Sequence, residues 1–214
     1  MPTFRDLAIA AYCPRQLYYE RREDDRSPPP DVAAKRKLAF QYPELLEVDE
    51  LPTEIAVTPT QFRTNLHCAR ARFDRFDELA DPADEMVLLT GKDARGIAHK
   101  VIGDPPVPSL VFTGSPPPNG VWHPQTVHAV AAAKALSWER ETPVERAFVE
   151  YPTHGIVREV CLTTRKKATY RRALRTVRAL DGPPPRLKNR EKCGACDFRT
   201  KCGVKTRSLR SLLS

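Results

Sequence analysis

The chain has 214 residues, of which 41% are hydrophobic and 29% are charged, and its formal net charge is +8. This length suffices for one substantial hydrophobic core, so we expect a single domain over residues 1–214. No apolar run approaches the roughly 20 residues that a membrane-spanning helix needs, and the N-terminus has no features of a secretory signal. The sequence therefore predicts a cytoplasmic protein without a membrane partner.

The first helices are predicted from capping and apolar spacing. Thr3-Phe4-Arg5-Asp6 forms a capping box that opens a helix to about Tyr12. Cys13-Pro14 interrupts this helix, and a second one continues to Arg22, so that residues 1–22 form an N-terminal helical segment. Further along, the pattern predicts a helix over 33–47 broken at Pro43, a short strand over Glu54–Thr58 and a helix over Gln61–Leu79.

The second half of the chain alternates between strands and helices. Three short strands are expected at Met86–Leu89, Ala98–Ile102 and Ser109–Phe112. A long helix from His123 to about Glu141, a hairpin over 144–162 and a final helix over Arg165–Leu180 follow. This order predicts an α/β (α+β) fold with a mixed central sheet.

Positive charge is concentrated at the C-terminal end. Residues 1–164 contain 19 Lys and Arg against 24 Asp and Glu, whereas residues 165–214 contain 16 against 3. Such an excess is typical of a surface that binds DNA or RNA, because phosphate contacts release counterions. A solvated helix face with a basic tail is the alternative. The cations predicted to contact DNA lie on the final helix and in the loop after it: Lys167, Arg171, Arg175, Arg178, Arg199 and Lys201.

Three cysteines near the C-terminus follow the spacing C-x2-C-x5-C: Cys193, Cys196 and Cys202. Two cysteines three residues apart can direct both sulfurs at one centre, and nearby cations favour the metal-binding thiolate. Residues 183–214 are therefore predicted to form a metal-binding loop with a basic tail, and Cys13 is the candidate for the fourth ligand. The spacing suits zinc and a [4Fe–4S] cluster equally well. Cys68 and Cys161 are not expected to take part.

Short patterns at both ends of the chain carry a family resemblance. Tyr12-Cys13-Pro14-Arg15 is followed by Leu17-Tyr18, and Thr142-Pro143-Val144 follows the long helix. Val149-Glu150-Tyr151-Pro152 and Leu162-Thr163 then precede the basic helix and the three cysteines. These patterns resemble the CRISPR-associated type-four (Cas-four) exonucleases.

The resemblance implies a RecB-like PD-(D/E)XK nuclease core and a [4Fe–4S] cluster held by four cysteines: Cys13, Cys193, Cys196 and Cys202. It also implies degradation of single-stranded DNA ends with Mn²⁺ or Mg²⁺. A further implication is a role in CRISPR spacer acquisition beside integrase proteins.

The catalytic residues that the resemblance implies are largely missing. Such chemistry needs carboxylates that converge on one or two metal ions, with a lysine near the nucleophile. Ile102 stands where the family has an aspartate, and Asp104 lies two residues later. The strand over 109–113, where the family has Glu-x-Lys, contains neither an acid nor a lysine. His67 precedes Ile102 at a distance that suits the family's histidine, so His67 and Asp104 are the remaining catalytic candidates.

The long helix departs from the family as well. Its Gln-x3-Tyr positions hold His128 and Ala132, and Gln125 lies one turn earlier. We therefore predict an Fe–S, DNA-binding member of the nuclease family with a degenerate catalytic centre, active in CRISPR adaptation or DNA-end processing. One alternative is an active Mn²⁺- or Mg²⁺-dependent exonuclease with a rearranged site that recruits other carboxylates: Asp84, Glu85, Asp93 or Asp104. Another is a zinc- or Fe–S-stapled nucleic-acid-binding module unrelated to CRISPR.

Overall fold

The computed structural model of this chain describes residues 1–23 and 29–203. Its centre is a five-stranded sheet in the order β1-β2-β3-β4-β5. The strands are β1 (Asp84–Thr90), β2 (Arg95–Ile102), β3 (Val107–Val111), β4 (Arg146–Tyr151) and β5 (Ile156–Cys161). Strands β3 and β4 are parallel, whereas the other neighbouring pairs are antiparallel. The fold is a mixed α/β fold with a mixed sheet, which confirms the predicted class.

The crossover between the parallel strands is α6 (His123–Glu139), which begins with a proline in its first turn. Its buried side chains are mostly small, and five of them are alanines: Ala129, Ala131, Ala132, Ala133 and Ala135. Small residues let the helix lie close to the strands beneath it. Among the described residues, no helix is both long enough and apolar enough to cross a bilayer.

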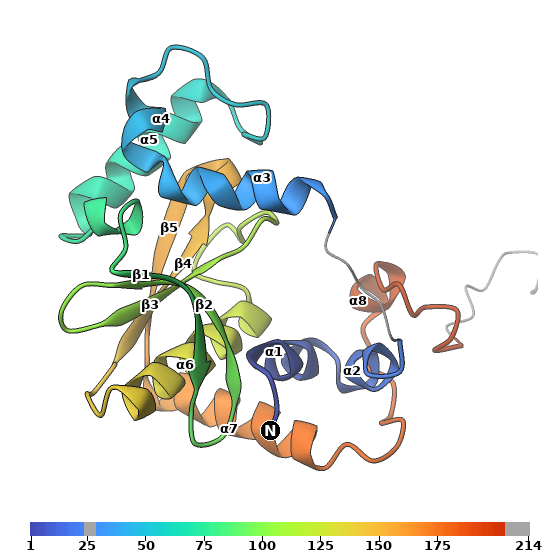
Figure 1. The fold of residues 1–214 in the computed structure, drawn as a ribbon. Coiled ribbons are helices and arrows are strands. Elements are labelled where there is room, and N and C mark those ends of the chain that lie inside the picture. Colours follow the sequence, from blue (N-terminus) through green and yellow to red (C-terminus); the bar gives the residue numbers. More distant parts are fainter. Residues whose placement is uncertain (24–28, 204–214) are drawn as a thin grey trace, which may run out of the picture.

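Helices cover both faces of the sheet (Figure 1). On one face, α1 (Phe4–Tyr12), α6 and α7 (Thr164–Arg178) share a hydrophobic core with the strands. On the other, the second core includes residues of η1 (Leu38–Phe40), α4 (Tyr42–Glu47), α5 (Pro59–Arg72) and η2 (Asp77–Leu79). Helix α3 (Asp31–Lys37) precedes η1, and the short η3 (Pro152–His154) connects β4 to β5.

Helix α1 forms as its sequence predicts. The Thr3 hydroxyl accepts a hydrogen bond from the Asp6 backbone N–H at 3.0 Å, and the Asp6 carboxylate accepts one from the Thr3 N–H. Phe4 and Leu7 are buried beneath the helix. Phe4 lies so close to β2 that a Cβ at Gly96 would come within 2.4 Å of its ring. A glycine at this position therefore lets α1 pack against the sheet.

Two short helices lie beside this layered core. Helix α2 (Pro14–Glu20) follows α1 after a single residue, and α8 (Arg190–Gly194) lies beside α2 (Figure 1). The Asn189 side chain caps α8 by accepting a hydrogen bond from the Lys192 backbone N–H at 2.9 Å. Helices α2 and α8, from the N-terminal and C-terminal segments, thus lie together outside the sheet.

The predicted strands of the middle region, the long helix, the hairpin and the final helix are all present. The strand expected over Glu54–Thr58 is wrong, because these residues form turns and coil. The helix expected over Gln61–Leu79 ends at Arg72, and a turn and η2 complete that stretch. Most of the basic tail, residues 204–214, lies outside the described residues.

Candidate functional site

Four cysteines from opposite ends of the chain line one pocket: Cys13, Cys193, Cys196 and Cys202. All four are half-buried, whereas Cys68 and Cys161 are exposed and do not line this pocket. No cysteine of the chain forms a disulfide. The structure therefore places the four predicted ligands together and the two other cysteines elsewhere.

The local backbone explains how the pocket forms. Cys13 is the single extended residue between α1 and α2, so the chain turns at its position. Pro14 begins α2 and prevents α1 from continuing. Cys193 lies in α8, and Cys196 and Cys202 lie in the turns after it. The N-terminal and C-terminal segments thus contribute one and three sulfurs respectively.

A set of contacts holds the C-terminal loop against α2. The Arg15 guanidinium donates a hydrogen bond to the Pro184 carbonyl at 2.9 Å, and the Tyr19 hydroxyl donates one to the Lys201 carbonyl at 3.2 Å. The Tyr19 ring also stacks on Phe198, with 5.6 Å between ring centres. Phe198 is 2% exposed. This contact set is absent from the sequence-based prediction, although aromatic residues beside Cys13 and Cys196 signal local packing.

The Cys196 thiol in this pocket has a pKa above that of a free cysteine, so it loses its proton less readily. Burial raises the pKa of the Cys196 thiol, and the nearby Cys13 and Cys202 raise it further by charge repulsion between thiolates. A bound cationic centre would relieve this repulsion. Arg15, Lys192 and Arg199 also line the pocket.

Two kinds of metal centre take four thiolates from a protein. A zinc ion with Zn–S bonds of about 2.3 Å needs its four sulfurs within about 4 Å of one another. In the described part of the chain, no group of three or more His, Cys, Asp or Glu side chains is arranged to hold a single ion. A [4Fe–4S] cluster also takes four thiolates but spreads them over four iron atoms. Four cysteines that line one pocket are compatible with either centre.

The predicted DNA-contacting cations occupy different surroundings. Arg171 and Arg175 are exposed on α7 and form no ion pair with any described residue. Arg178, by contrast, pairs with Asp93 at 2.9 Å, and Lys201 pairs with Glu23 at 2.5 Å. Arg199 is exposed beside the cysteine pocket, and Lys167 is half-buried in a separate groove. Arg171, Arg175 and Arg199 are therefore the exposed members of the predicted set that form no ion pair with a described residue.

The nuclease candidates are not assembled into a catalytic centre. Ile102 is buried at the end of β2, and Asp104 is exposed in the following turn. His67 is exposed on α5. Of the alternative carboxylates, Asp84 pairs with Arg140 and Asp93 with Arg178. Asp84 is the first residue of β1 and Asp93 lies in the turn after its other end, so the two are roughly 20 Å apart at 3.3 Å per residue.

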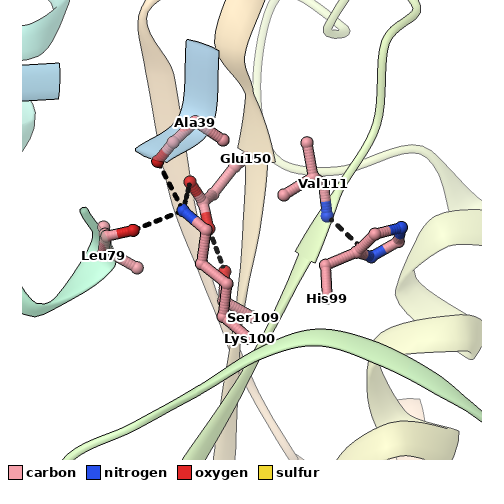
Figure 2. Close-up of polar contacts among 7 residues, drawn as sticks. All are labelled: Ala39, Leu79, His99, Lys100, Ser109, Val111 and Glu150. Carbon is pink, nitrogen blue, oxygen red and sulfur yellow. Dashed lines mark hydrogen bonds and ion pairs between the residues drawn. The ribbon is translucent and has the colours of Figure 1, made fainter. Parts of the chain in front are cut away.

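A buried charged network lies near the expected catalytic position (Figure 2). Lys100 of β2 and Glu150 of β4 form an ion pair of 2.8 Å, and both side chains are fully buried. Ser109, which lies between them on β3, donates a hydrogen bond to the other Glu150 oxygen at 2.5 Å. The Lys100 ammonium also donates to the carbonyls of Ala39 and Leu79. All three of its protons are thus used within the protein.

This network is absent from the sequence-based prediction, although the sequence contains a signal for it. Lys100 lies beside Val101 and Ile102, and Glu150 lies between Val149 and Tyr151. A single charge within an apolar strand is expected to be buried and paired. As predicted, the strand over 109–113 contains neither a lysine nor an acid. Its neighbouring strands β2 and β4 supply Lys100 and Glu150 instead.

Two histidines near the long helix are held neutral. The His128 ring contacts Phe4 and Phe112 at 5.8 and 5.7 Å between ring centres. Burial lowers the pKa of His128 to about 4 and that of His99 to about 3, the latter also through Arg36, His128 and Lys100. His99 Nδ1 accepts a hydrogen bond from the Val111 backbone N–H at 3.2 Å.

We expect acid to destabilise the fold through these histidines. The pKa values of both lie below the 6.5 of the unfolded chain, so the unfolded state binds more protons between about pH 6.5 and pH 4. Their stabilisation is complete above pH 6.5 and is lost as the pH falls, by up to about 1.4 kcal/mol per pH unit for each histidine. Urea unfolding of wild type and His128→Gln across this range measures the effect. The variant should have a shallower slope, and the exposed His67→Gln serves as the control; equal slopes in all three proteins would contradict the prediction.

Gln125 has a partner other than the one that the resemblance implies. It accepts a hydrogen bond from the Tyr151 hydroxyl of β4, rather than pairing with a tyrosine on its own helix.

Comparison with known proteins adds no further assignment: no family model matches this chain, and the search of curated proteins returned no match.

Proposed function

We propose that this chain is an Fe–S protein that binds single-stranded DNA on a RecB-like nuclease scaffold and does not cleave it. One observation carries the proposal: four cysteines from the two ends of the chain line a single pocket, and the two remaining cysteines lie outside it. The mixed sheet with helices on both faces is compatible with the nuclease scaffold that the resemblance implies.

The proposed cofactor is a [4Fe–4S] cluster held by Cys13, Cys193, Cys196 and Cys202. The resemblance at both ends of the chain is to a cluster-containing family, and this favours the cluster over zinc. When bound, the cluster supplies a covalent cross-link between the N-terminal helices and the C-terminal loop.

The proposed partner is DNA, because α7 exposes cations that no described carboxylate neutralises. Arg171 and Arg175 lie four residues apart on one face of the helix, about 6 Å along its axis. The chain after α7 leads directly to the cysteine loop (Figure 1). A single DNA strand that runs along α7 would therefore end beside the proposed cluster. The association with CRISPR integrase proteins is supported by the resemblance alone.

Binding without cleavage is proposed because the catalytic groups are replaced. Ile102 occupies the metal-binding aspartate position and is buried. The nearest lysine and glutamate, Lys100 and Glu150, are paired with each other in the interior. A phosphate and a hydrated Mn²⁺ or Mg²⁺ would have to displace this pair and the helices above it.

We expect Arg171→Ala with Arg175→Ala to weaken DNA binding about tenfold or more. The slope of log K against log salt should become shallower by about 1.4, because each lost single-strand contact removes about 0.7. Fluorescence anisotropy with a labelled single-stranded oligonucleotide at several salt concentrations measures both quantities. The matched control, Arg70→Ala with Arg72→Ala, removes the same charge from α5 on the opposite side of the sheet. If both double variants weaken binding equally, the effect is one of net charge and α7 is not the binding surface.

A further inference from the structure

A second surface feature lies at the other end of α7 from the cysteine pocket. A groove runs between the C-terminal half of α6, the connection to β4 and the first turns of α7. Among its lining residues are Lys134, Trp138, Glu145 and Lys167. Lys134 and Trp138 are four residues apart, so they lie on one face of α6. The sequence-based prediction includes Lys167 but not the other three.

The Trp138 ring is unusually available. It is 57% exposed, and its indole N–H forms no hydrogen bond with a described residue. The other tryptophan, Trp122, is also exposed, but its indole N–H donates to the Ser115 carbonyl at 2.9 Å. Trp122 is thus anchored to its own loop, whereas Trp138 presents its ring to solvent.

One lysine contacts this ring, and two others line the same groove. The Lys92 ammonium lies 5.9 Å from the centre of the Trp138 ring, and Lys134 and Lys167 line the groove beside it. None of the three forms an ion pair with a described residue. The groove contains one acid, Glu145, and the nearby acids Asp93 and Glu139 are engaged by Arg178 and by the Thr90 backbone N–H. Of the charged residues that line the groove itself, two are lysines and one is an acid, so the lining has a net charge of +1.

An exposed aromatic ring among cations is the combination that binds single strands. The cations contact phosphates, and the ring stacks on a base, which contributes for any base because each has a π-face. In a duplex the bases are stacked on one another, so a surface indole cannot reach a base face. We propose that Trp138 stacks on an unpaired base of single-stranded DNA, with Lys134 and Lys167 on the flanking phosphates.

This assignment rests on the proposed DNA-binding function and refines it. Lys167, Arg171 and Arg175 continue from the groove along α7, over about 12 Å of helix. A single strand bound there would lie between the Trp138 groove and the cysteine pocket. The protein would then prefer single strands to duplexes of the same sequence.

The test uses the full-length protein carrying Trp122→Phe, which leaves Trp138 as its single tryptophan. Titration with oligothymidylate should quench the Trp138 fluorescence, whereas a base-free polyanion such as polyphosphate should displace the DNA without causing that quenching. Trp138→Ala should weaken single-strand binding about tenfold to a hundredfold. The same variant should bind duplex DNA as before and keep the salt slope of wild type, because an indole contacts no phosphate. Trp138→Phe should restore most of the affinity.

The outcomes separate the two proposals. If the protein binds DNA with a steep salt dependence but Trp138→Ala binds single strands like wild type, the stacking proposal is wrong and the α7 interface stands. Equal weakening of single-strand and duplex binding would also overturn it. If wild type binds no nucleic acid, or binds with a flat salt dependence, the proposed function itself fails. An acidic peptide that quenches Trp138 more strongly than oligothymidylate would assign the groove to a protein partner instead.

Discussion

Cys13→Ala is expected to abolish the binding of iron and the visible absorbance of an Fe–S cluster. Cys13 is the single proposed ligand from the N-terminal segment, and the remaining three cysteines cannot complete the four thiolates that the proposed cluster takes. Because the binding free energy of a metal centre is also folding free energy, the variant should lose the ordered C-terminal loop. Iron analysis and limited proteolysis of residues 186–203 measure the two effects.

The structure supplies matched controls for this substitution. Cys68→Ala and Cys161→Ala remove exposed thiols outside the pocket and should retain full iron. Tyr19→Phe removes the hydrogen bond to the Lys201 carbonyl but keeps the ring that stacks on Phe198, so it should retain iron as well. Full iron content in Cys13→Ala would show that the two ends of the chain are not joined through a cluster.

Lys100→Met is expected to reduce the free energy of unfolding by about 3–5 kcal/mol. The substitution leaves the Glu150 carboxylate fully buried without its ion-pair partner, with the Ser109 hydroxyl still donating to it and the Tyr42 hydroxyl beside it. It also removes the hydrogen bonds that the ammonium donates to Ala39 and Leu79, which join the sheet to the helices above it. Chemical unfolding of the purified variant measures the loss.

A double-mutant cycle separates the ion pair from its surroundings. Lys100→Met with Glu150→Gln should lose less stability than the sum of the two single variants, because no unpaired charge remains buried. The partly exposed pair Arg146–Glu159, which joins β4 to β5 at 3.1 Å, provides the control and should contribute about 1 kcal/mol or less. The pair would instead be catalytic if the wild type cleaved DNA with Mn²⁺ and Lys100→Met lost this cleavage while it kept wild-type stability.

Local signals account for the part of the fold that the sequence predicted. The capping box at Thr3 and the alternation in β4 and β5 act within a few residues, so each element could be assigned without knowledge of its neighbours. Glu54–Thr58 alternates in the same way but forms no strand. Its backbone contact with the sheet region is a hydrogen bond from Ala56 to the Thr153 carbonyl. Alternation indicates a strand only where a partner strand is available, and the sequence does not show that partner.

The candidate sites also differ in whether local sequence signals or tertiary contacts form them. The cysteine pocket could be predicted because three of its cysteines are close in sequence and the sequence also indicates Cys13 as the candidate for the fourth position. The Lys100–Glu150 pair joins residues 50 positions apart, and its remaining hydrogen bonds go to backbone carbonyls that any sequence would provide. Trp138 likewise has a role only because α6 places it beside the first turns of α7. Such sites depend on tertiary contacts that no local pattern encodes.

Metal and sulfide analysis of the anaerobically purified full-length protein tests the central claim most directly. The proposed cluster predicts about four iron atoms and four inorganic sulfides per chain, without zinc. One zinc atom per chain with no sulfide would contradict the cluster and assign the same four cysteines to a zinc site.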